Sequence, residues 1–269
     1  MQYDPVKKSV GRFFSGSVAG RKIFLLLLDL LLLRAWHVRR ALRRVALKNP
    51  HKASMLDAGA GFGQYSWRLG RMNGNWKIKA VDIDPDHTGA NRDFFEKAGM
   101  EGRIKCETAD LRELNDSEAY DFILSVDVME HIDDDQKVFG NFFRALKPGG
   151  ILLISTPSDK GGSDVHGKDD RSFIDEHVRD GYSIAEITEK LSKAGFRNIR
   201  AKYTYGKPGH ISWILSMKIP VKIAGTSRFF LLLLPFYYMV VFPFAVILNI
   251  FDIFLTHSTG TGLLVSADR

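Results

Sequence analysis

The segment from Met55 to Gly63 reads M-L-D-A-G-A-G-F-G, and it constrains the fold more than any other part of the chain. An apolar run that passes through a carboxylate into three alternating glycines is typical of a buried strand turning sharply into a helix. Glycine adopts backbone conformations closed to other residues, and the N–H groups of the following helix can bind a ligand. A dinucleotide-binding turn needs a third glycine where this chain has Gln64. We therefore expect a site for a different small molecule at Gly59 and Gly61.

Strand and helix patterns alternate after this turn begins. Apolar runs are separated by helical segments, an order typical of α/β folds with a parallel sheet. Cys106 is the single cysteine, which excludes an internal disulfide and suits a reducing compartment. The expected strands are 53–57, 76–82, 104–108, 120–126 and 151–156, and the expected helices include 64–71 and 135–146.

Two longer strings make the pattern specific. They read Y-D-F-I-L-S-V-D-V-M-E-H-I from Tyr120 and L-K-P-G-G-I-L-L-I-S-T-P from Leu146. Together with the glycine turn they resemble the class I S-adenosylmethionine (SAM) methyltransferases, in particular the UbiG-like small-molecule enzymes, over about residues 50–205. The resemblance implies SAM as cofactor and a Rossmann-like, seven-stranded, doubly wound sheet with an antiparallel last strand. The runs at 198–205 and 261–266 would then be the sixth and seventh strands.

The resemblance also implies a set of cofactor-binding residues at the carboxyl ends of the strands. Asp82 follows the glycines at about the 20-residue distance at which α/β nucleotide sites place a carboxylate for ribose hydroxyls. Ile83 would lie against the adenine ring, and Asp110 would accept from its amino group, unless Asp110 is only a turn or cap residue. The expected cofactor-binding set is Asp57, Gly59, Gly61, Gly63, Asp82, Ile83, Asp110, Leu111 and Val126.

The end of the fourth strand carries the candidates for catalysis. A sulfonium methyl group is already activated, so the protein has mainly to align an acceptor and remove its proton. We expect His131 to take this proton and Glu130 to orient the histidine or bind the substrate, although His131 could also be a residue that only packs beneath the cofactor. Asp127, Glu130 and His131 would share a helical face, which also permits a divalent metal. We expect no metal, and these three residues are the candidates if one binds.

Basic charge is concentrated near the start of the chain. The net charge is +7, and residues 1–53 carry twelve Lys or Arg against two Asp, so the remainder is slightly acidic. A leucine-rich run at 23–33 is too short to cross a bilayer, which takes about 20 residues. The segment 36–48 is amphipathic, with apolar residues at 38, 41, 42 and 45 opposite four arginines. We expect it to lie on an anionic membrane surface; the alternative is packing on the protein's own core.

A second hydrophobic element lies near the end of the chain. The run 229–251 contains no charge and is long enough to span a membrane. A single crossing would separate the sixth strand from the seventh, so we expect a kinked or re-entrant element broken by Pro235 and Pro243. The alternative is an apolar lid over the active site. The expected units are a helical arm at 1–49, a catalytic core at 50–205, a membrane-associating insertion at 206–257 and the last strand within 258–269.

These patterns predict a SAM-dependent methyltransferase on the cytoplasmic face of a membrane, monotopic or re-entrant. Two apolar elements beside the catalytic core predict a lipophilic substrate: a quinone or phenol, an aryl or polyene lipid, or a lipid-linked sugar. The resemblance favours transfer to oxygen. We expect no nucleic-acid partner, because the basic residues lie away from the catalytic end. The alternatives are an RNA or protein methyltransferase and a non-catalytic membrane scaffold; no oligomeric state is predicted.

Overall fold

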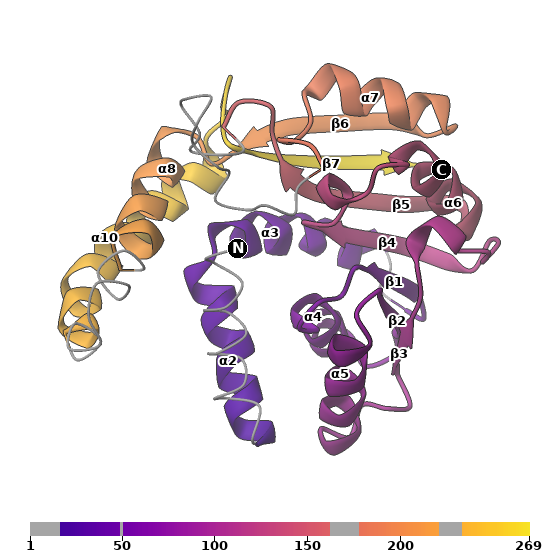
Figure 1. Ribbon diagram of the computed structural model, residues 1–269, viewed down its shortest axis with the longest axis horizontal. Helices are drawn as coiled ribbons and strands as arrows, with labels where there is room; N and C mark the ends of the chain where they lie inside the picture. The colour runs from indigo at the N-terminus through magenta and orange to yellow at the C-terminus, as the bar shows by residue number, and fades with distance from the viewer. Residues whose placement is uncertain (1–16, 49–50, 162–177, 221–232) are drawn as a thin grey trace.

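The computed structural model describes residues 17–48, 51–161, 178–220 and 233–269 of the chain. Seven strands form one sheet in the order β3-β2-β1-β4-β5-β7-β6, as Figure 1 shows. The first five are parallel, and β7 runs antiparallel between β5 and β6. The predicted sheet and its antiparallel last strand are therefore confirmed. The strands are β1 (Ser54–Ala58), β2 (Lys77–Asp82), β3 (Ile104–Thr108), β4 (Tyr120–Val126), β5 (Leu146–Pro157), β6 (Arg197–Thr204) and β7 (Gly262–Asp268).

Both faces of the central strands are buried, which explains why they read as continuous apolar runs. Successive residues alternate between two cores: Met55 and Phe122 face one, and their neighbours Leu56 and Ile123 face the other. The first core is covered by α2 (Val18–Leu31), α3 (Leu33–Lys48), α4 (Gln64–Met72) and α5 (Pro85–Lys97). The second is covered by α6 (Asp135–Ala145) and α7 (Ile184–Lys193).

Helix α3 corrects the expectation of a membrane-surface helix at 36–48. The side chains of Val38, Leu42 and Val45 are buried in the first core, and α3 packs against β5 and β7. The alternative, a helix packed on the protein's own core, is what the structure shows. The apolar stripe was read as facing lipid because its periodicity does not specify which apolar surface will cover it.

Helix α2 is apolar on its outer side. It begins at the N-cap Ser17, whose hydroxyl accepts a hydrogen bond from Gly20 N, and it ends before Leu32. Its buried face carries two charged residues, Arg21 and Asp29, together with Phe24 and Leu25. The large residues on its exposed face are Ile23, Leu26, Leu27 and Leu30, which recur at helical spacing.

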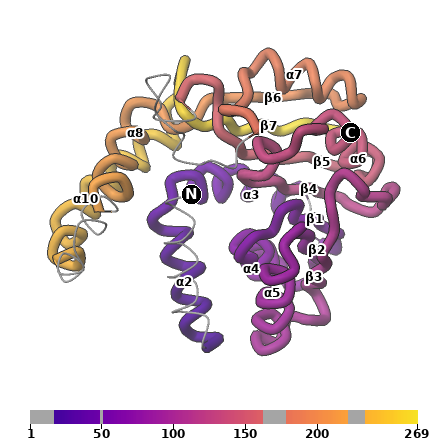
Figure 2. The backbone as a smooth tube through the Cα atoms, in the orientation of Figure 1, coloured from indigo at the N-terminus to yellow at the C-terminus, as the bar shows by residue number. Residues whose placement is uncertain are grey.

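Between β6 and β7 the chain forms α8 (Lys207–Trp213), the π-helical segment η3 (Ile214–Lys218) and α10 (Leu234–Phe254). The helices are antiparallel: the Ser212 hydroxyl donates to Ala245 O at 3.1 Å, and the Tyr237 hydroxyl donates to Leu215 O at 2.7 Å. Figure 2 shows this α8–α10 hairpin and α2 projecting from the body of the domain. The residue pair Thr204 and Gly262 joins β6 to β7, so the hairpin leaves and re-enters the sheet at one end.

The prolines do not interrupt α10, which corrects the expectation that they break the run. Pro235 lies in the first turn, where its missing N–H has no helical acceptor to lose, and Pro243 is accommodated inside the helix. Residues 229–232 of the predicted run lie outside the described part of the chain. By length and composition alone, α10 is apolar enough to cross a membrane, and little of it is buried.

Candidate functional site

The glycine turn stands at the carboxyl end of β1. Gly59, Gly61 and Gly63 have φ angles of +82°, +48° and +76°, a region that side chains other than glycine rarely adopt. A Cβ at Gly59 would collide with the Val128 side chain, and one at Gly63 would lie 2.7 Å from Asn91 Oδ1. A Cβ at Gly61 would meet no atom within 4 Å. The first and third glycines are therefore required by packing, whereas Gly61 borders open space that a ligand can approach.

Asp82 ends β2 beside this turn, as its spacing predicted. Its carboxylate accepts from Gly61 N at 2.6 Å and from Asp84 N at 2.9 Å. Burial raises the pKa of Asp82, but the neighbouring His87 and the backbone N–H groups outweigh it and hold the pKa below its ordinary value. Ile83 follows with 67 % of its surface exposed, unusual for a large apolar residue. An ionised carboxylate and an exposed apolar side chain fit a ribose and an adenine ring.

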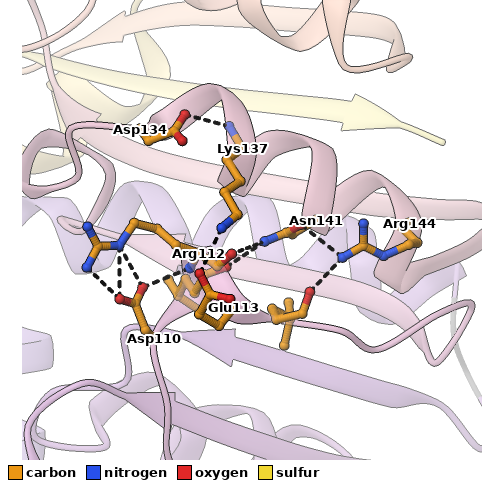
Figure 3. Close-up of polar contacts among 9 residues, drawn as sticks. Asp110, Arg112, Glu113, Asp134, Lys137, Asn141 and Arg144 are labelled. Carbon is orange, nitrogen blue, oxygen red and sulfur yellow. Dashed lines mark hydrogen bonds and ion pairs between the residues drawn. The ribbon is translucent and has the colours of Figure 1, made fainter.

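Asp110 caps the short helix η1 (Leu111–Glu113) and is bound by Arg112 (Figure 3). Its carboxylate accepts from Arg112 N at 2.8 Å and from Arg112 Nη2 at 2.6 Å. The Arg112 guanidinium holds the pKa of Asp110 below its usual range. Asp110 therefore has the cap role that sequence left open, and its contact with an adenine amino group stays a prediction. Leu111 and Val126, the two apolar members of the predicted set, are buried.

Helix α6 fixes this loop, and sequence reasoning did not identify its residues. Asn141 Nδ2 donates to Leu111 O at 2.9 Å and to Arg112 O at 3.0 Å, and Lys137 Nζ donates to Glu113 Oε1 at 2.7 Å (Figure 3). Arg144 Nη2 donates to Leu114 O at 2.7 Å. Side chains of α6 thus bind three backbone carbonyls of the loop after β3.

Asp57 lies beneath the turn rather than at its surface. It is buried in β1, and its Oδ2 accepts from the Ser66 hydroxyl of α4 at 2.6 Å. Burial raises the pKa of Asp57 to about 6, against the opposing effect of Ser66. Asp57 thus joins the strand to the first turn of α4 and borders the predicted cofactor site from below.

Glu130 is a buried carboxyl group near the carboxyl ends of β4 and β5. It is 1 % exposed, and its Oε2 accepts from the Thr156 hydroxyl at 3.0 Å. Burial raises the pKa of Glu130 to about 7, although Thr156, Arg34 and Arg179 each lower it. A carboxyl group with this pKa exchanges its proton near neutral pH, which suits a proton acceptor.

The shared helical face expected for Asp127, Glu130 and His131 is wrong. The helix η2 (Met129–His131) spans three residues, and Asp127 precedes it with a φ of +51°. Glu130 is buried, His131 is exposed, and Asp127 forms an ion pair with Arg34. Asp127 lies outside this short 3₁₀ turn, and the neighbours Glu130 and His131 point in different directions, so the three side chains are separated. Within the described residues, no group of three His, Cys, Asp or Glu side chains could hold a metal ion.

Arg34, from the N-terminal segment, reaches the carboxyl ends of the strands. This position was not predicted from the sequence. Its guanidinium pairs with Asp127 at the end of β4, and its backbone N donates to the Tyr205 hydroxyl at 2.8 Å. Tyr65 of α4 is also buried nearby, and burial raises its pKa to about 12 while the charge of Arg34 lowers it. Arg34, a basic residue in the first turn of α3, thus lies beside the carboxyl ends of β4 and β5.

Helix α2 is bonded directly to the glycine turn. Arg21 Nη2 donates to Phe62 O at 3.0 Å and to Asn91 Oδ1 at 2.7 Å. Asp29 Oδ1 accepts from Gln64 Nε2 at 2.8 Å, and its second oxygen pairs with Arg68. Asp29, the single acidic residue in the leucine run, is the sequence feature that could have predicted these contacts, because a buried charge needs a partner.

Comparison with known proteins shows which family and which curated proteins this chain resembles. The family model described as a methyltransferase domain matches residues 33–201, from the first residue of α3 to within β6, so α2 and the α8–α10 hairpin lie outside the match. Ubiquinone biosynthesis O-methyltransferase of Paramagnetospirillum magneticum is 30 % identical over 103 residues, 38 % of this chain and 40 % of that protein. Phosphoethanolamine N-methyltransferase 2 of Caenorhabditis elegans is 25 % identical over 151 residues, 55 % of this chain and 33 % of that protein. The chain thus aligns with less than half the length of these curated relatives.

Solved structures share the fold. Phosphoethanolamine N-methyltransferase 2 of Haemonchus contortus, in complex with SAM, superposes with a TM-score of 0.60 at 19 % identity and covers 89 % of this chain and 56 % of that one. A sarcosine dimethylglycine methyltransferase assigned in Galdieria sulphuraria superposes with a TM-score of 0.56 at 20 % identity and covers 87 % of this chain and 83 % of that one.

Proposed function

The chain belongs to the methyltransferase domain family, and on that premise we propose that it transfers the methyl group of SAM to an oxygen of a lipophilic, membrane-borne small molecule. The cofactor is held at the glycine turn. The open space at Gly61, the carboxylate of Asp82 and the exposed side chain of Ile83 support this position. Bound SAM supplies a methyl group already activated on a sulfonium sulfur.

Glu130 is the proton acceptor in this proposal. It lies at the ends of β4 and β5, where the acceptor substrate must approach the neighbouring cofactor site. The Thr156 hydroxyl donates to one carboxylate oxygen, which fixes the orientation of the carboxyl group. His131 is the weaker candidate because its side chain is exposed at the end of η2. Transfer to nitrogen is the second candidate, since curated relatives include N-methyltransferases.

The lipophilic substrate is inferred from two exposed apolar faces, one on α2 and one on α10, beside the carboxyl ends of the strands. Exposed apolar surface on this scale marks an interaction site, and a membrane fits helices whose exposed faces are mainly apolar. The hairpin returns to the sheet where it left, so it dips into one leaflet without separating β6 from β7. The exposed residues of α10 include Phe236, Met239, Val240, Phe244, Ile247, Phe251 and Phe254.

The test is incubation of the full chain with methyl-labelled SAM and a membrane lipid extract. Label is expected in the organic phase, and base-stable ether linkages would identify transfer to oxygen. The Asp82→Ala variant is the control, because it removes the ribose ligand while leaving the apolar faces intact. Label found only in water-soluble acceptors, RNA or protein would contradict the proposal. A cellular role unaffected by Asp82→Ala would favour a scaffold.

A further inference from the structure

A buried arginine joins α2 to the glycine turn. Arg21 is 7 % exposed, and a single nitrogen, Nη2, donates to Phe62 O at 3.0 Å and to Asn91 Oδ1 at 2.7 Å. Arginine stays charged in proteins, and burying a charge is costly unless acceptors meet it. Phe62 lies between Gly61 and Gly63, so one of these acceptors is the backbone of the glycine turn itself.

Asn91, on α5, connects Arg21 to the neighbouring peptide of the turn. It is fully buried, and its Nδ2 donates to Gly61 O at 2.8 Å. An amide side chain has one accepting end and one donating end, whereas a guanidinium can only donate. Arg21 therefore fixes Oδ1 toward itself, and this orientation directs the Nδ2 group at Gly61 O.

The peptide group between Gly61 and Phe62 is held from its carbonyl side. The carbonyl accepts from Asn91, and on the other side of Gly61 its N–H donates to Asp82 at 2.6 Å. In a trans peptide the N–H points away from the carbonyl, so the Phe62 N–H points away from Asn91. Within the described ranges, Phe62 N donates to no protein atom. A free donor thus stands beside the open space at Gly61, where a Cβ would meet no atom within 4 Å.

Helix α2 is bonded to the domain near both of its ends. Arg21 lies near its start, and Asp29, near its end, accepts from Gln64 at 2.8 Å and pairs with Arg68 of α4. The methyltransferase family model matches residues 33–201, so Asn91 belongs to the matched domain and Arg21 lies before it. The contact between α2 and the turn therefore adds a residue to the cofactor site from outside the matched domain.

We propose that Arg21 is a positioning residue of the cofactor site and that the docking of α2 is linked to SAM binding. Through Asn91, Arg21 holds the peptide after Gly61 in the orientation that leaves the Phe62 N–H for a polar group of the cofactor. The inference rests on the proposed function, because it takes SAM to lie at the glycine turn. Linkage is reciprocal, so SAM strengthens the docking of α2 by the same factor by which docked α2 strengthens SAM binding.

Isothermal titration of the full chain with SAM tests the positioning role without any methyl acceptor. Arg21→Met is expected to raise the Kd for SAM about tenfold, the effect of losing the alignment of one hydrogen bond. Arg21→Lys is expected to stay within about threefold of the wild type, because both bonds come from one nitrogen and an ammonium group can also form them. Lys22→Met removes the adjacent, exposed cation and is expected to leave the Kd unchanged.

Asn91→Asp separates docking from positioning. A carboxylate still accepts from Arg21, so α2 should stay docked, but it has no proton for Gly61 O. Chymotrypsin reports docking through cleavage after Phe24, a buried residue of α2 that none of these variants changes. In the wild type, saturating SAM is expected to slow this cleavage about tenfold, as reciprocity requires. Asn91→Asp should resist cleavage like the wild type without SAM, bind SAM about tenfold more weakly and gain no protection from it.

Wild-type SAM affinity in Arg21→Met or Asn91→Asp would overturn the inference, as would protection by SAM that Asn91→Asp leaves intact. An Arg21→Lys variant as weak as Arg21→Met would contradict the contact assigned to Nη2. Loss of SAM binding in Asp82→Ala but not in Arg21→Met would keep SAM at the glycine turn and remove only the role of Arg21. The expected variant pattern without methyl transfer to any acceptor would support the role of Arg21 and remove the proposed enzyme function.

Discussion

Replacing Glu130 with Gln is expected to abolish most activity while making the protein more stable at alkaline pH. Gln has the same shape, and its amide oxygen can still accept from Thr156, so the change removes only the charge and the ionisable proton. As the proton acceptor, Glu130 should contribute about 10²- to 10⁴-fold to the rate. In the wild type, kcat should rise with pH through about 7 and then level off. The variant should lose this rise.

The stability effect follows from the same pKa. Burial raises the pKa of Glu130 from 4.5 to about 7, so the folded protein holds this proton more tightly than the unfolded chain does. The stabilisation is fully present below pH 4.5 and is lost as pH rises through 7. The difference between the two pKa values corresponds to about 3 kcal/mol for this buried group.

Urea unfolding at pH 5 and pH 8 measures the effect. Glu130→Gln should match the wild type near pH 5 and exceed it at pH 8 by up to about 3 kcal/mol. Glu113→Gln is the matched control, because Glu113 is exposed and should show no such gain. A variant that loses stability equally at both pH values, or that keeps its activity and pH profile, would refute the assigned role.

Three further perturbations test the rest of the site. Gly61→Ala puts a Cβ into open space at a φ of +48°, so calorimetry should show SAM affinity reduced at least tenfold, with about 1 kcal/mol lost from folding. Arg21→Met removes the bonds to Phe62 O and Asn91 and should expose α2 to limited proteolysis, whereas Lys22→Met, at an exposed position, should not. Phe244→Glu should reduce co-sedimentation with anionic vesicles while leaving the urea midpoint unchanged, since its side chain is exposed; undiminished vesicle binding would contradict the membrane face.

The contacts predicted correctly from sequence are those fixed by the fold. In a parallel sheet the carboxyl ends of β1 and β2 must lie together, so the nearness of Gly61 and Asp82 followed from strand order and spacing. No comparable rule relates Arg34 to Asp127, because their contact depends on how α3 crosses the sheet. The contacts of Arg21 and Asp29 could not be predicted for a similar reason, because their partners lie on α4, α5 and the glycine turn.

Periodicity identified amphipathic helices but not the surfaces that cover them. The apolar stripe containing Val38 and Leu42 packs on the sheet, although its arginine-rich opposite face is also typical of a membrane-surface helix. The reverse holds in α2, where polar Arg21 and Asp29 face inward and leucines face outward. Hydrophobicity alone does not orient α2, because buried hydrogen bonds to the glycine turn and α4 determine its orientation.

A buried carboxylate, Asp252, joins the hydrophobic hairpin to α3 and to the end of β6. Asp252, near the end of α10, accepts from Gly209 N at 2.9 Å and from Tyr205 N at 3.2 Å, where the chain passes from β6 into α8. His37 Nε2, on α3, lies 2.8 Å from the same carboxylate. The helix that presents His37 also presents Arg34 one turn earlier. The Asp252 carboxylate therefore ties the hairpin to the helix that presents Arg34, the residue that pairs with Asp127.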